Sequence, residues 1–254
     1  MRTSNPALKA GMFLNARSHG MGETMTMRGT VNKCFILLAL IVGGASWVWG
    51  KIMGLAEGTE PAQAAGYLMP LIFISLVVGG IIALVTVFNP SWSPVTAPVY
   101  AICEGFLLGG ISAYYEMSYP GIVMQAVMLT FGTLLCMLTA YRSGLIQVTD
   151  KFRLGIVAAT GAIMLVYLVS WVFSFFNVGI FNFIHAATPI GIGFSVVVVV
   201  IAALNLVLDF DMIDNACEQG LQKHMEWYGA FALMVTLIWL YMEILRLLAK
   251  TRRR

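Results

Sequence analysis

The sequence predicts an all-α membrane protein, a polytopic bundle of seven transmembrane helices, and two observations carry this prediction. Hydrophobic residues make up 59% of the 254 residues and charged residues only 11%, whereas roughly 25% of the residues in a soluble domain are charged. Apolar runs of about twenty residues, the length needed to cross ~30 Å of hydrocarbon, recur along the chain.

Seven apolar runs of this length follow one another, mostly with short connections. They cover Val31–Gly50, Ala65–Phe88, Val95–Tyr115, Ile122–Tyr141, Leu154–Phe176, Pro189–Leu208 and Tyr228–Leu248. Prolines on both sides of Trp92 predict a turn between the second and third spans, because proline stops a helix. The apolar stretch Asn177–Thr188 is too short to span, so we expect it to lie in the interface or to dip back into the protein. Long polar connections are predicted at Lys51–Gln63, Arg142–Arg153 and Asp209–Trp227.

These runs divide the chain into three regions. Residues 1–30 form a polar N-terminal tail, expected to be mobile or at most a short surface helix. Residues 31–249 form the seven-helix transmembrane domain, and residues 250–254 a basic C-terminal tail. A cleaved signal peptide is not expected, because the first apolar run follows about thirty polar residues and further spans come after it.

The distribution of Lys and Arg favours an N-terminus in the cytoplasm. With that orientation nine basic residues lie on the inner side and six on the outer side, and cytoplasmic loops carry the excess of positive charge. We therefore expect a multi-pass protein of the cell (inner or plasma) membrane. The basic C-terminus argues the other way, and a half-span near residues 177–188 would put both ends inside, so the side of the C-terminus stays open.

Several classes of function are not expected. The basic residues flank the membrane and form no aromatic-interleaved patch, so the lipid bilayer and not a nucleic acid is the expected partner. The cysteines have no metal-binding spacing and are expected to be reduced packing residues. They are Cys34, Cys103, Cys136 and Cys217. No HExxH, GxSxG or P-loop motif is present, so neither an enzyme nor a resident cofactor is expected.

Four carboxylates lie in or against the apolar spans: Glu104, Asp209, Asp211 and Glu243. An ionisable group in hydrocarbon costs on the order of a few kcal/mol, so it is a functional candidate by default. Neither Glu104 nor Asp209 has an obvious basic partner nearby in sequence. For Glu104 a structural role and a role in a wet cavity are equally supported.

The acids at the end of the sixth span divide by helical spacing. Asp209 shares a helix face with Asn205, whereas Asp211 shares one with Asp214. We therefore expect Asp209 to point inward beside Asn205, which favours a function, and Asp211 and Asp214 to face the polar loop and be ordinarily solvated.

On the last span, Glu243 has two interpretations. Arg246 follows three residues later, so an ion pair at the membrane edge is the alternative to a functional site. Thr236, two turns earlier on the same face, would extend a polar stripe into the bilayer. In the third span Gly105 and Gly109 have the GxxxG spacing that lets helices pack closely in lipid.

Four stretches of the chain resemble the bacterial YccA-like branch of the Bax inhibitor-1 (TMBIM) family, from about residue 27 to the C-terminus. They begin at Met27, Trp92, Ala203 and Glu226 and read MRGTVNK, WSPVTAPVYAICEGFLLGGIS, ALNLVLDFD and EWYGAF. The resemblance implies a bundle whose last helix is central. It also implies a pH-sensitive calcium leak channel, in which an aspartate ending the sixth helix shares a proton with one on the seventh.

Carried over to this chain, the sixth-helix aspartate of the family falls on Asp209, with Asp211 as the other register. The seventh-helix aspartate falls on Thr236, which is not an acid. Glu243 is the nearest acid on that helix, two turns away or about 10 Å along the axis. Glu104 matches the glycine-rich third span of the family.

The sequence and the resemblance together predict a passive calcium leak pathway gated by proton binding. Carboxylates with an amide oxygen suit Ca²⁺, so Asp209 and Glu104 are the predicted ligands, with Asn205 nearby and Ca²⁺ as a permeant or bound ion. The alternative is a non-transporting stress adaptor or regulator of a membrane protease, supported by a polar tail that another protein could grip. The oligomeric state stays open.

Overall fold

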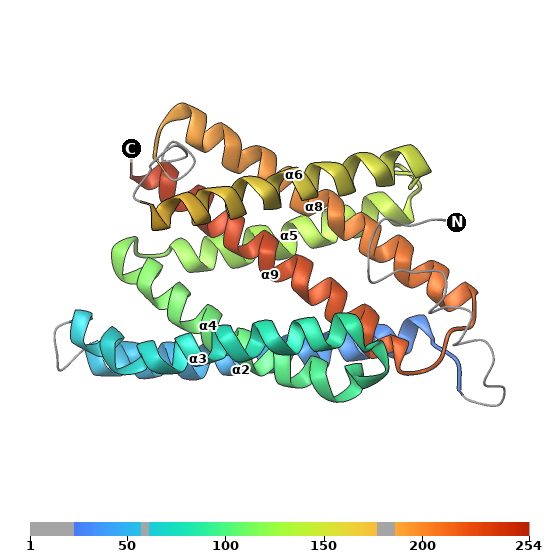
Figure 1. The fold of residues 1–254 in the computed structure, drawn as a ribbon, viewed down its shortest axis with the longest axis horizontal. Helices are drawn as coiled ribbons and strands as arrows, with labels where there is room; N and C mark the ends of the chain where they lie inside the picture. Colours follow the sequence, from blue (N-terminus) through green and yellow to red (C-terminus); the bar gives the residue numbers. More distant parts are fainter. Residues whose placement is uncertain (1–22, 57–60, 177–185, 254) are drawn as a thin grey trace. The chain divides into compact units, whose positions relative to one another are not determined.

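The structure, a computed structural model, describes residues 23–56, 61–176 and 186–253. This part of the chain contains seven helices long and apolar enough to cross a membrane. They are α2 (Met27–Ala56), α3 (Pro61–Phe88), α4 (Ser93–Ser118), α5 (Ile122–Arg142), α6 (Asp150–Phe175), α8 (Pro189–Glu218) and α9 (Met225–Arg252) (Figure 1). The predicted all-α, seven-span fold class is confirmed.

The helix boundaries differ from the prediction most at α8. This helix runs ten residues past its predicted end, to Glu218, so the prediction of a polar connection from Asp209 onward is wrong. Phe210, Ile213 and Ala216 are buried, and their spacing of three continues an apolar face into this acidic segment. Gly220 then ends the helical path, because its φ of 63° is one that glycine adopts readily.

Two other predictions fall at the limits of the described residues. Helix α2 begins at Met27, inside the predicted polar tail. Most of the short apolar stretch before α8, residues 177–185, lies outside the described residues.

The chain divides into two compact units, each described here by itself. The first comprises Met1–Ser118 and Met212–Met234, and the second Tyr119–Asp211 and Val235–Arg254. Helices α8 and α9 contribute to both units. Half of the most apolar part of α9 is buried, a larger share than in any other described span.

In the first unit, α4 packs closely against α2 and α3. A Cβ atom added at Gly105 would lie 2.6 Å from the Ile41 carbonyl oxygen, and one added at Gly109 would lie 2.5 Å from that of Ala45. Side chains would therefore separate the two backbones, which confirms the predicted packing role of the GxxxG spacing. The four cysteines are free; Cys34, Cys103 and Cys217 are half-buried, whereas Cys136 is exposed and does not have the packing role that was predicted for it.

Candidate functional site

Asp209 of α8 and Thr236 of α9 meet within the second unit. The Thr236 hydroxyl group donates a hydrogen bond to the Asp209 carboxylate. The Oδ2 atom of Asp209 is inaccessible to solvent and has no hydrogen-bond partner among the described residues, although the residue as a whole is partly exposed. The contact joins the two positions to which the resemblance carries over the aspartates of the family's sixth and seventh helices.

The helix segments on both sides of this contact are apolar. Leu206 and Val207 on α8 and Leu240 on α9 are fully buried. A carboxylate in such surroundings has little water to stabilise its charge. Among the described residues no Lys or Arg forms an ion pair with Asp209.

Asn205, predicted to lie beside Asp209, directs its side-chain amide elsewhere. Its Nδ2 atom donates to the Thr160 hydroxyl oxygen on α6 and to the Ile201 carbonyl oxygen, each at 2.8 Å. The amide thus ties α8 to α6 one turn before Asp209.

Asp211 is not a loop-facing, ordinarily solvated acid, and that prediction is wrong. Its carboxylate forms an ion pair with Arg153 in the first turn of α6, and its side chain is only 17% exposed. The partner lies 58 positions away, so no local spacing could have shown it. The pair joins α6 to α8 within the second unit.

Glu243 forms the predicted ion pair with Arg246, at 2.8 Å, but the carboxylate is almost completely buried. The Tyr167 hydroxyl group of α6 also donates to it, at 3.0 Å, and the Arg246 guanidinium lies 5.2 Å from the centre of the Tyr167 ring. Asp209 and Glu243 therefore have separate partners, and Glu243 does not replace the family's seventh-helix aspartate opposite Asp209.

Glu104 lies on α4 in the first unit. Tyr100, one turn earlier, donates a hydrogen bond to its carboxylate, and the Tyr100 ring packs edge-on against Phe231 with centroids 5.0 Å apart. A Cβ atom added at Gly79 of α3 would lie 3.7 Å from Glu104 Oε1. The acid thus lies at the contact between α3 and α4.

The predicted calcium ligands, Glu104 and Asp209, belong to different units. Each has one tyrosine or threonine hydroxyl group as a hydrogen-bond donor. Within the described ranges no group of three or more His, Cys, Asp or Glu side chains is placed to hold a metal ion. Joint ligation of Ca²⁺ by these two acids stays a prediction.

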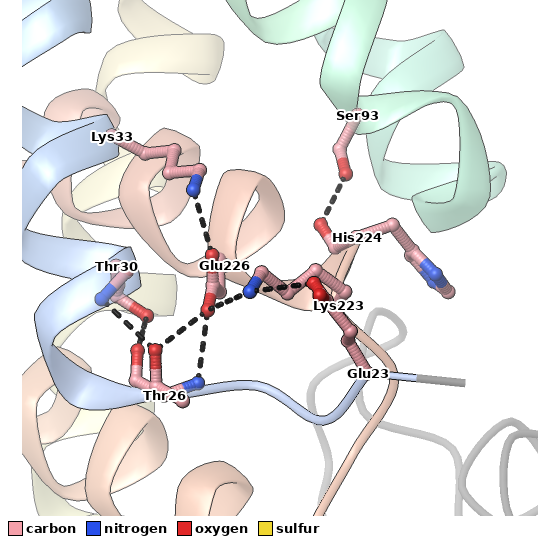
Figure 2. A network of polar contacts seen from close by, with 9 residues as sticks. Glu23, Thr26, Thr30, Lys33, Ser93, Lys223, His224 and Glu226 are labelled. Carbon is pink, nitrogen blue, oxygen red and sulfur yellow. Dashed lines mark hydrogen bonds and ion pairs between the residues drawn. The ribbon is translucent and has the colours of Figure 1, made fainter. Parts of the chain in front are cut away.

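A buried carboxylate that the sequence analysis did not single out is Glu226, at the start of α9 (Figure 2). It binds Thr26 and Lys33, so two of the four family-like stretches, those beginning at Met27 and Glu226, meet here through Lys33 and Glu226. The sequence signal for this contact was the presence of a charged residue in each of these two stretches, Lys33 in the first and Glu226 in the second.

Two titratable groups in the α8–α9 connection have shifted pKa values. The hydrogen bond to Glu23, with the nearby Glu226 carboxylate, raises the pKa of Lys223. Burial lowers the pKa of His224, whose carbonyl oxygen accepts a hydrogen bond of 2.9 Å from the Ser93 hydroxyl group (Figure 2).

Seven apolar helices with carboxylates buried among them define a multi-pass membrane protein. A family model described as Bax inhibitor 1 like matches residues 5–253, nearly the whole chain. The protein therefore belongs to the Bax inhibitor 1 like family, as its sequence predicted, while the YccA-like branch stays a prediction. Comparisons with curated proteins and with solved structures found no match.

Proposed function

We propose that this protein is a passive, pH-sensitive leak pathway for cations, with calcium as the ion, in the cell membrane. The observation that carries the proposal is the carboxylate of Asp209. It lies in a membrane-spanning helix, bonds to Thr236, and has a solvent-inaccessible oxygen with no hydrogen-bond partner among the described residues.

Calcium fits this chemistry because it is a hard cation that prefers carboxylate, hydroxyl and carbonyl oxygens. A proton bound to Asp209 removes the negative charge that would attract the ion. Protons and calcium ions would then compete for one carboxylate, and the competition makes the leak depend on pH. Thr236 does not titrate in this range, so a proton shared between two aspartates is not part of the proposal.

The other predicted site residues have supporting roles in this proposal. Glu104, bonded to Tyr100, is a second carboxylate that a hydrated cation would visit. The ion pair of Asp211 and the hydrogen bonds of the Asn205 side-chain amide join α8 to α6. Glu243, which pairs with Arg246 and accepts a hydrogen bond from Tyr167, joins α9 to α6. We propose a non-enzymatic protein without a resident cofactor, with its N-terminus in the cytoplasm and the bilayer as its surroundings.

Calcium uptake into liposomes across a pH series tests the proposal. Asp209→Asn keeps the shape of the side chain and removes its charge, Glu104→Gln does so in the first unit, and Glu218→Gln, an exposed acid at the end of α8, is the matched control. We expect Asp209→Asn to abolish the pH dependence, Glu104→Gln to reduce the flux, and the control to behave like the wild type.

Unchanged flux in both Asp209→Asn and Glu104→Gln would contradict the assignment of the site. No flux from the wild-type protein at any pH would contradict the channel. It would favour the alternative of a membrane adaptor or protease regulator, which predicts a co-purifying membrane-protein partner that stays bound to both variants.

A further inference from the structure

Glu226 lies in the first turn of α9 and is completely buried. Its Oε1 atom accepts hydrogen bonds from the Thr26 backbone N–H, at 3.0 Å, and from the Thr26 hydroxyl group, at 2.8 Å. Lys33 of α2 forms an ion pair with Oε2 at 2.8 Å, and Lys223 lies 3.9 Å from Oε1 (Figure 2). One carboxylate therefore joins three parts of the chain.

The residues before α2, Glu23–Thr26, form a short extended segment that we name the N-terminal strap. It pairs with the α8–α9 connection, because Met25 N–H donates to the Leu221 carbonyl oxygen at 2.6 Å and Lys223 N–H donates to that of Glu23 at 3.0 Å. The Met25 side chain is buried in a small apolar cluster with Ile213 and Leu221. The strap thus lies against the connection that leads into α9.

The first turn of α2 is shaped around the Glu226 side chain. A Cβ atom added at Gly29 would lie 2.0 Å from Glu226 Oε1, closer than any real contact. Glycine therefore leaves the space that the carboxylate fills. An alanine at position 29 would push the carboxylate out of its place without changing any charge.

Because Glu226 is completely buried, the contact depends on the partners of its carboxylate. A buried carboxylate is stable only when it is paired and hydrogen-bonded, and loss of a partner leaves an uncompensated charge. The second ion pair of the cluster, between Lys223 and Glu23, is exposed, since the Glu23 side chain is 80% accessible. Exposed ion pairs contribute little to stability. The buried carboxylate of Glu226 is therefore the main attachment of the strap to α9.

We propose that Glu226 is a positioning residue, the lock that holds the start of α9 against the N-terminal strap and α2, and that release of this lock opens the leak pathway. This regulatory role rests on the proposed function. Helix α9 is unbroken from Met225 to Arg252, and Thr236 follows Glu226 by ten residues, about 15 Å along the axis. Because the two residues lie on one continuous helix, we expect a displacement of the first turn of α9 to be transmitted along the helix to Thr236.

Amide hydrogen exchange and calcium flux, measured on the full-length protein in liposomes, test the lock. The variants are Glu226→Gln, which removes the charge, and Gly29→Ala, which displaces the carboxylate and keeps every charge. Glu23→Gln is the matched control, because it removes an acid from the same strap but only an exposed ion pair. If Glu226→Gln fails to fold, Gly29→Ala alone decides the question.

We expect exchange of the strap amides to accelerate about tenfold or more in both lock variants, since a hydrogen bond to a charged group contributes at least the ~1.4 kcal/mol that corresponds to that factor. Calcium flux at a pH where the wild type conducts weakly should rise about fivefold or more, the lower end of typical couplings between sites. Glu23→Gln should change neither quantity.

Three results would overturn the lock. They are unchanged exchange of the strap in both variants, faster exchange with unchanged flux, and equal effects of Glu23→Gln. If the wild type itself shows no flux, the proposed function fails, and the lock is decided by exchange in the first ten residues of α9. Acceleration there would support the lock and unchanged rates would refute it.

Discussion

Asp209 has a hydroxyl group opposite it, where the family resemblance implies a second aspartate. The Thr236 hydroxyl group donates a hydrogen bond to the Asp209 carboxylate, so the position to which the resemblance carries the second aspartate holds a side chain that is not an acid. Glu243, seven residues further along α9, forms an ion pair with Arg246 and accepts a hydrogen bond from Tyr167. In the proposed mechanism a single carboxyl group, that of Asp209, therefore binds the proton.

Replacing Thr236 by aspartate should create a coupled pair of acids at this site. Two carboxyl groups that share a site titrate in two steps that belong to the pair, so calcium flux of Thr236→Asp should show two transitions with pH in place of one. Thr236→Val is the control, because it removes the hydroxyl group and adds no titrating group. A single unchanged transition in Thr236→Asp would show that the two side chains do not face each other.

His224 should make the folded protein less stable in mild acid. Burial lowers its pKa in the folded state, whereas an unfolded histidine titrates near ~6.5. The contribution of His224 to the free energy of unfolding is present above the pKa of the unfolded state. It is lost as the pH falls through the pKa of the folded state, because protons then bind the unfolded chain preferentially.

Thermal unfolding in detergent from pH 7.5 to pH 5 would measure this effect. Below about pH 6.5 the melting temperature of His224→Gln should decrease less than that of the wild type. Equal pH profiles for the two proteins would contradict a role for His224.

Helix α4 depends on two glycines for its approach to α2. A Cβ atom at position 109 would lie 2.5 Å from a backbone oxygen, and backbone cannot move aside as a flexible side chain can. Gly109→Ala should therefore destabilise the protein by about 1–3 kcal/mol, the typical cost of overpacking, which a lower melting temperature would reveal.

Gly132→Ala on α5 is the matched control, since a Cβ atom there meets nothing within 4 Å. It should leave stability unchanged or raise it by up to ~1 kcal/mol, because alanine favours a helix over glycine. A similar loss of stability in both variants would mean that helix propensity, and not the α2–α4 contact, decides the effect.

At the scale of the helices, the sequence alone predicted the features that depend on residues close together in the chain. Runs of about twenty apolar residues gave seven spans, and spacing gave the pair of Glu243 with Arg246. The extension of α8 was missed because three acids in Asp209–Asp214 concealed an apolar face with helical spacing. The Asp211–Arg153 and Glu226–Lys33 pairs join residues far apart in the chain, and only the folded structure shows such partners.

The arrangement of the whole chain in the membrane follows from seven crossings. If each helix crosses once, the α5–α6 connection lies on the side of the N-terminus and the C-terminus lies on the other side. Leu145 in that connection and Thr251 near the C-terminus are exposed, so cysteines placed there would report the two sides.

With the native cysteines replaced, a membrane-impermeant thiol reagent on intact cells should label Thr251→Cys and should reach Leu145→Cys only after permeabilisation. This labelling is expected because the side of the membrane with more basic residues, here the side of the N-terminus, stays in the cytoplasm. The reverse labelling would contradict the predicted orientation. Protection of both sites would instead place both ends inside, as a half-span near residues 177–188 would require.

The most direct test of the central claim is the calcium flux of Asp209→Asn, compared with the wild type in liposomes at neutral and at mildly acidic pH. The account predicts a wild-type flux that changes between the two pH values and a flux through Asp209→Asn that is the same at both, because the titrating carboxyl group is gone. A variant that keeps the full pH response of the wild type would contradict it.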